Sequence, residues 1–163
     1  MKPRVRDESG FALIEMLIAI VVINVGLLAI LLALTSGVTT LRRSAETSTA
    51  SAVADRQVER YRAFAYASIY LDTAALAATD STYQADAAYS ASQVNQACGT
   101  LVPVCTPTQT VTGPDGRSYR VDTYIVSTTP AGGTAVKQVT VVVRKSGTTA
   151  TLARVVATAG TDF

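Results

Sequence analysis

The feature that most constrains this chain is an apolar run near its N-terminus. The run extends from Phe11 to Leu34 and is interrupted only by Glu15 and Asn24. As an α-helix it would be about 36 Å long, at about 1.5 Å per residue. The hydrocarbon core of a bilayer is about 30 Å thick. The sequence therefore predicts a single helix long enough to cross a membrane.

The ten residues before the run are polar and slightly basic, because Lys2, Arg4 and Arg6 outnumber Asp7 and Glu8. A basic flank stays in the cytoplasm, which predicts a single-pass inner-membrane protein with its C-terminal bulk outside. A cleaved secretory signal fits less well, because the run is longer than a usual signal core. The small-residue pair Ser9-Gly10 also lies before the run and not after it. A plain signal anchor stays open as an alternative.

Glu15 is difficult to explain in a plain anchor. A carboxylate one turn into a membrane helix costs on the order of 2–3 kcal/mol, and less near the interface. An ionisable residue in such a place is a functional candidate, and it needs a partner.

The segment Gly10-Phe11-Ala12-Leu13-Ile14-Glu15 resembles the type III signal of type IV prepilins and of type II secretion pseudopilins. The resemblance implies that a prepilin peptidase cleaves after Gly10 and methylates the new N-terminal Phe11. It also implies that Glu15 serves assembly. The charge chemistry fits this role, because the Phe11 amine and a neighbouring subunit's Glu15 would each remove the penalty of burying the other.

The helix is expected to continue beyond the apolar run, because no proline occurs between Pro3 and Pro103. Apolar residues then recur at helical spacing: Val58, Tyr61, Ala65 and Ile69. We therefore expect a cleaved leader at 1–10, a membrane or filament-core helix at 11–34, and an amphipathic continuation at 35–71. Residues 72–105 are expected to form a variable loop region with a disulfide.

The pattern changes to a period of two in residues 106–163. The expected strands are Thr106–Thr112, Arg117–Ser127, Val136–Arg144 and Thr149–Ala157. Turn sequences separate them, so they predict an antiparallel sheet. A small sheet needs cover on one face, and the amphipathic half of the helix can supply it. The predicted fold is α+β, with a long N-terminal helix packed on a small antiparallel sheet, which is also what the resemblance to pilins implies.

Cys98 and Cys105 are the only cysteines. The predicted topology places them outside the cytoplasm, where disulfides persist. We expect a structural disulfide between them, worth roughly 2–3 kcal/mol. The alternative is two free thiols or redox chemistry, although the spacing is not that of a redox CxxC motif.

Composition argues against an enzyme. The chain has no histidine, which is the commonest general base and metal ligand. Two cysteines are too few for a structural zinc site. The carboxylates of the C-terminal loops, Asp115, Asp122 and Asp162, are too sparse to claim a calcium site. We therefore expect no catalytic residues, no metal and no cofactor.

The leading hypothesis is a structural subunit of a type IV pilus, and a minor one. The segment Val25–Leu28 is similar to minor pilins, and the helix lacks the proline that major pilins often carry. The alternative is a pseudopilin of a type II secretion system or of a DNA-uptake pseudopilus. The partners implied are other pilin subunits, prepilin peptidase, the inner-membrane assembly platform, and membrane lipid before assembly. The final location would be a cell-surface pilus or a periplasmic pseudopilus.

A third hypothesis is a DNA-uptake receptor, which would need a basic surface with aromatic platforms. Arg117, Arg120, Arg144, Lys145 and Arg154 are cations present in the C-terminal part. They are spread among the predicted strands, and the net charge is only +2. DNA binding is therefore not supported by the sequence.

Overall fold

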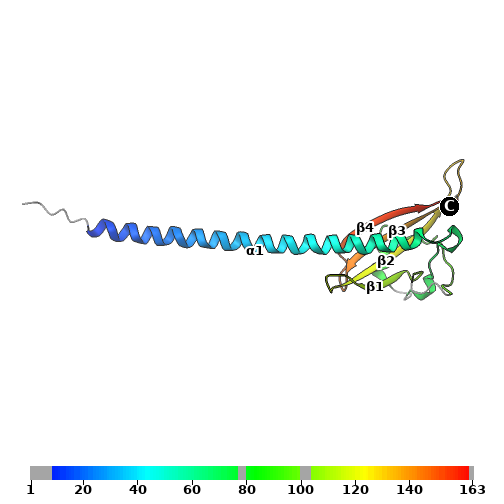
Figure 1. Ribbon diagram of the computed structural model, residues 1–163, viewed down its shortest axis with the longest axis horizontal. Helices are drawn as coiled ribbons and strands as arrows, with labels where there is room; N and C mark the ends of the chain where they lie inside the picture. The colour runs from blue at the N-terminus through cyan, green and yellow to red at the C-terminus, as the bar shows by residue number, and fades with distance from the viewer. Residues whose placement is uncertain (1–8, 77–79, 100–103, 162–163) are drawn as a thin grey trace, which may run out of the picture. The chain divides into compact units, whose positions relative to one another are not determined.

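The computed structural model describes residues 9–76, 80–99 and 104–161. The chain divides into two compact units, Met1–Ser44 and Ala45–Phe163. A single long helix, α1 (Ser9–Arg62), contributes to both units (Figure 1).

The first unit, in its described part, is helical throughout and has no core. The large apolar side chains from Leu13 to Leu41 are all exposed, with exposed fractions between 48% at Val38 and 73% at Leu13. Within the described residues, α1 is the one helix long and apolar enough to cross a membrane. Its most apolar stretch has a mean hydropathy of 3.0, and none of that stretch is buried.

The second unit contains the end of α1 and a four-stranded antiparallel sheet in the order β1-β2-β3-β4. The strands are β1 (Thr108–Thr112), β2 (Ser118–Thr128), β3 (Val136–Lys145) and β4 (Thr151–Ala159). Consecutive strands are neighbours, so the sheet is a simple meander. Its centre pairs Val121 with Val143 and Val141 with Val155. The predicted α+β pilin-like fold is confirmed.

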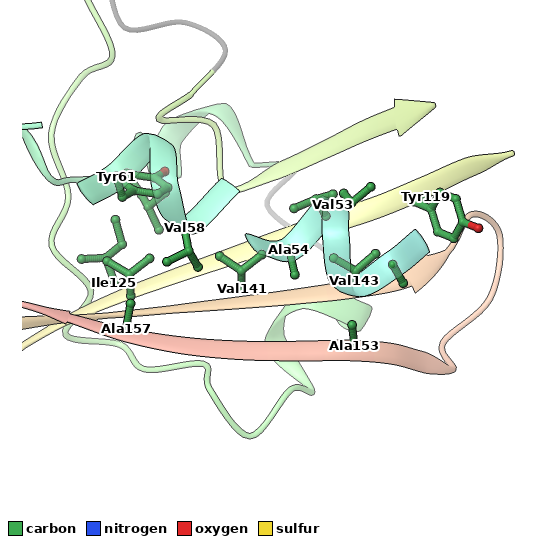
Figure 2. Packing of buried hydrophobic residues seen from close by; sticks show 14 of the residues in the cluster. Val53, Ala54, Val58, Tyr61, Tyr119, Ile125, Val141, Val143, Ala153 and Ala157 are labelled. Carbon is green, nitrogen blue, oxygen red and sulfur yellow. The ribbon is translucent and has the colours of Figure 1, made fainter. Parts of the chain in front are cut away.

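The core lies between α1 and one face of the sheet. Figure 2 shows Val53, Ala54 and Val58 of α1 pointing towards the strands. The strands contribute residues at alternate positions, because successive side chains of a strand point to opposite faces. They are Tyr119, Val121 and Ile125 of β2, Val139, Val141 and Val143 of β3, and Ala153 and Ala157 of β4.

The opposite face, here called the outer face, is covered in part by the segment between α1 and β1. That segment contains a 3-10 turn (Thr73–Ala75) and a short helix, α2 (Ser81–Gln84). Tyr83 of α2 stacks on Tyr124 of β2, with ring centroids 4.3 Å apart. Val142 of β3 completes this second apolar cluster. The cover lies over β2 and β3, whereas Val156 on β4 remains 49% exposed.

The amphipathic continuation was expected to reach residue 71, but α1 ends at Arg62. Tertiary contacts compete with the helical spacing there. The chain forms a 3-10 turn at Tyr66–Ser68, and the ammonium group of Lys137 donates to the carbonyls of Tyr66 (2.7 Å) and Ile69 (2.8 Å). Leu71 then forms an isolated bridge with Asn95. The four strands lie within about two residues of their expected bounds, a common difference at element ends.

Candidate functional site

The residues that the sequence singles out for processing and assembly lie at the start of α1. Gly10 and Phe11 are in its first turns, and Glu15 follows about one turn later. The Glu15 side chain is exposed. It is surrounded along the helix by exposed apolar side chains, including Leu13, Ile14 and Met16. A carboxylate therefore lies within an apolar surface.

Other polar side chains in this part of α1 are satisfied within the helix. The Asn24 amide donates to the Ile20 carbonyl at 2.8 Å. The Thr35 hydroxyl lies 3.1 Å from the Leu31 carbonyl oxygen and 2.9 Å from that of Leu32. Such bonds to the preceding turn let a polar side chain enter lipid at low cost, because no donor is left unpaired.

Glu15 differs from these residues. Among the described residues it has neither a hydrogen-bond donor nor a cation as a partner. A carboxylate accepts hydrogen bonds but cannot donate to the carbonyl of the preceding turn, so Glu15 cannot be satisfied in the way that Asn24 and Thr35 are.

The disulfide between Cys98 and Cys105 is present, with the two Cα atoms 5.7 Å apart. The expectation of a structural bridge is confirmed. It packs against Tyr70. Asp72 holds both ends of the bridge, because its carboxylate accepts from the Cys98 amide at 3.1 Å and its amide donates to the Cys105 carbonyl at 2.9 Å.

The bridged loop is also tied to the end of α1. The Tyr61 hydroxyl donates to the Val104 carbonyl at 2.6 Å. Burial raises the pKa of Tyr61 far above its ordinary value, so the hydroxyl stays protonated and can donate at any physiological pH. This hydrogen bond therefore links the bridged loop to the end of α1.

A chain of alternating charges on the outer face, buried at its centre, was not predicted. Three arginines from β2, β3 and β4 alternate with three aspartates: Asp80, Arg120, Asp122, Arg144, Asp86 and Arg154, each contacting the next. Asp122 is fully buried and Arg144 is 3% exposed. The Arg144 guanidinium bridges Asp122 and Asp86.

This network fastens the loop region to the sheet. Asp80 and Asp86 flank α2, while their arginine partners lie on three strands. Burial by itself would raise the pKa of Asp86, but hydrogen bonds from the Ala88 amide and Arg154 outweigh it, and the pKa is lowered. The pKa of Asp80 is lowered in the same way by Arg120 and the Tyr83 amide.

One signal of the network was visible in the sequence. Arg120 and Asp122 are two residues apart on a strand, so both must point to the same face. The Arg120 partner Asp80 lies 40 residues away in a segment without clear periodicity, and that pairing could not be predicted.

The network also accounts for most cations that might have formed a nucleic-acid surface. Arg120, Arg144 and Arg154 are paired in it, and the remaining two, Arg117 and Lys145, both contact Glu46. The carboxylates considered for calcium are engaged elsewhere: Asp122 in the network, and Asp115 as acceptor of the Tyr119 hydroxyl at 2.6 Å. Asp162 lies outside the described residues.

Comparison with known proteins identifies the N-terminal segment. Residues 5–34 match the prokaryotic N-terminal methylation motif. This motif is the signature of type IV pilin and pseudopilin precursors. No curated protein and no solved structure matches the chain. The chain therefore carries the N-terminal signature of a pilin-like structural subunit on an α+β fold of the pilin type.

Proposed function

We propose that this protein is a structural subunit of a type IV pilus, anchored in the inner membrane by α1 before it is assembled. The observation that carries the proposal is the unpartnered Glu15 on an exposed apolar helix, inside a methylation motif. An exposed apolar helix must be covered by lipid or by other helices, because its contact with water is unfavourable.

The proposed maturation step is cleavage by prepilin peptidase between Gly10 and Phe11. Hydrolysis of that peptide bond leaves a carboxylate on Gly10 and an α-amine on Phe11, which is then N-methylated. The basic leader, with Lys2, Arg4 and Arg6, is lost with the cleaved segment. Its removal allows the start of α1 to leave the cytoplasmic interface, since the leader's charges no longer hold it there.

Glu15 is proposed to neutralise the Phe11 amine of a neighbouring subunit. A carboxylate and an ammonium group are each costly to bury alone, and the cost falls when they are paired. Pairing between subunits makes assembly favourable for both groups. It also favours one relative position of neighbouring helices, because Glu15 follows Phe11 by four positions and this spacing sets the offset.

The finer assignment we propose is a minor pilin. It is supported by the absence of proline from Gly10 to the end of α1. The second candidate is a pseudopilin of a type II secretion system or of a DNA-uptake pseudopilus, which would use the same N-terminal chemistry. The two candidates differ in which filament contains the protein, and in how abundant the protein is there relative to the main subunit.

The test compares Glu15→Val with Asn24→Val in the full-length chain. Both changes remove a polar side chain from the apolar run, but the Asn24 amide is satisfied within its own helix. We expect both variants to be cleaved and to remain in the membrane. Only Glu15→Val should be lost from sheared filaments, and Glu15→Asp should show an intermediate defect. Equal incorporation of Glu15→Val and wild type would contradict the neutralising role.

Cleavage is tested by N-terminal sequencing and mass spectrometry of the filament-associated protein. The mature chain should begin at methylated Phe11. A mature chain that still begins at Met1 would refute the proposed processing.

A further inference from the structure

The sheet of the second unit has two open edges, β1 and β4. Within the described residues, the ladders β1–β2 and β3–β4 use one side of each edge strand, and no other strand pairs with the second side. No backbone hydrogen bond outside the β3–β4 ladder is made by residues 151–159 either, as far as the described chain extends. Rows of unpaired backbone groups are a template for a further strand.

β4 lacks the devices that normally protect such an edge. It contains no proline, and its one charged side chain, Arg154, is held by Asp86 at 2.8 Å. The register irregularity between Val143 and Arg144 disturbs only the beginning of the strand. The stretch from Ala153 to Ala159 is therefore seven residues of regular edge, with Val156 exposed on its outer face.

β1 is the complementary edge. Its five residues, Thr108–Thr112, carry no charge, and Pro107 and Pro114 limit its length. Thr110 pairs with Arg120 within the sheet, so its side chain lies on the outer face, like that of Val156. Pairing of the two edges would place threonine and valine side chains side by side, a favourable cross-strand combination for β-branched residues.

The number of strands decides how two copies would meet. Because the sheet has four strands, all antiparallel, β4 runs opposite to β1. A second copy in the same orientation therefore presents its β1 antiparallel to β4 of the first, which is the more stable pairing. The two surfaces differ, so the contact is heterologous and each copy leaves one edge free for the next.

We propose that β4 of one subunit pairs with β1 of the next copy of this chain along the filament, joining their sheets. This inference rests on the proposed function, because subunits assembled through the same N-terminal helix share one polarity. It requires only that copies be neighbours, so it also applies to a minor subunit that forms a short run.

The contact is too small to act alone. Five paired residues extend about 17 Å, at about 3.4 Å per residue. Stable interfaces bury about 1,200–2,000 Å² in total, which a ladder of this length does not approach. The strands are therefore expected to pair only where α1 has already brought two copies together.

The first test introduces Thr110→Cys and Val156→Cys together in the full-length chain. Within one chain these positions are three strand spacings apart, about 14 Å at about 4.8 Å each, and they are also offset along the strands, so they are too far apart for a disulfide. Mild oxidation of intact filaments should give a ladder of covalent multimers on a non-reducing gel. A second pair, Thr110→Cys with Thr158→Cys, tests a register between the two copies that is shifted by two residues. Each cysteine substitution made alone should give no ladder.

Absence of multimers with both pairs, in filaments that contain the protein, would overturn the inference. Dimers formed by Val156→Cys alone would also overturn it, because they would mean that β4 pairs with β4. Absence of the wild-type protein from every filament would instead count against the proposed function.

The second test compares Thr110→Glu/Val156→Lys with Thr110→Lys/Val156→Lys, which differ only in the sign of one charge. The two positions within one chain are farther apart than the screening length of about 8 Å at physiological salt. We expect the oppositely charged pair to enter filaments roughly three- to fivefold better. Processing and formation of the Cys98–Cys105 bridge serve as folding controls. Equal incorporation of the two variants would contradict the contact.

Discussion

Apolar side chains are usually buried and charged side chains are usually exposed, and the two units of this protein depart from this rule in different ways. Residues 13–41 expose every large apolar side chain that they contain, whereas residues 45–161 hold a chain of six alternating charges whose centre, Asp122 and Arg144, is buried. The first unit is incomplete by itself, since its exposed apolar surface is unfavourable in water and needs an apolar cover. The second unit is complete, since each buried charge has a partner within the same chain. Changes in the first unit should therefore affect assembly, and changes in the second should affect folding.

The largest effect is expected from Arg144→Met. The change keeps an apolar stem but leaves Asp122 and Asp86 without their shared guanidinium, and removal of one partner from a buried pair costs about 3–5 kcal/mol. Urea unfolding of the detergent-solubilised protein, followed by tyrosine fluorescence, measures it, because the chain has seven tyrosines and no tryptophan.

Arg154→Met is the matched control for this network. Its side chain is 37% exposed, and Asp86 keeps Arg144 as a partner. We expect a loss of about 1 kcal/mol or less. Similar costs for Arg144→Met and Arg154→Met would mean that burial of the charges does not determine their importance.

The second prediction makes the same substitution in both units. Leu71 is 0% exposed and Leu28 is 60% exposed. Leu71→Ala should lower the free energy of unfolding of the second unit by about 2–5 kcal/mol, because it leaves a cavity. Leu28→Ala should change that free energy by less than about 0.5 kcal/mol, as for a surface site. If Leu71→Ala and Leu28→Ala lowered the free energy of unfolding equally, the two units would not differ in this respect.

The third prediction concerns the disulfide within the loop region, between Cys98 and Cys105. Replacing both cysteines, Cys98→Ser with Cys105→Ser, should destabilise the second unit by about 2–3 kcal/mol through the entropy of the unfolded chain. Membrane insertion of the first unit should be unchanged. The measurement is urea unfolding with and without a reductant. If the reductant also lowered the stability of the Cys98→Ser/Cys105→Ser variant, the loss of stability could not be attributed to the bridge.

The smallest expected effect is a dependence on acidity that belongs only to the second unit. The pKa of Asp80 and of Asp86 is lowered in the folded state, so their charged forms stabilise it. This contribution is fully present above the unfolded carboxyl pKa of about 3.9 and is lost as the pH falls through the lower folded values. The free energy of unfolding should therefore fall below about pH 4, and Asp86→Asn should reduce the slope. If Asp86→Asn left the slope of the free energy of unfolding against pH unchanged, the Asp86 carboxyl would not be a cause of the pH dependence.

Local pattern predicted most of the fold for identifiable reasons. Val139, Val141 and Val143 alternate with other residues along β3, and that period reveals a strand with one face in the core. Turn residues placed the strand ends, and the cysteine pair suggested the bridge. The end of α1 was predicted nine residues too late, because Ala65 and Ile69 continue the helical spacing although Lys137 holds their segment in another conformation.

By itself, the sequence determined the apolar helix, the methylation motif, the place of Glu15 within it, and the period of the strands. These properties depend on residues close together in the chain, so their physical causes are local. Only the tertiary structure decided where α1 ends, how the loop region is held to the sheet, and which arginines are neutralised. Those outcomes depend on partners such as Asp86 and Arg144, 58 residues apart. Their meeting is determined by the packing of the whole unit, which no local pattern contains.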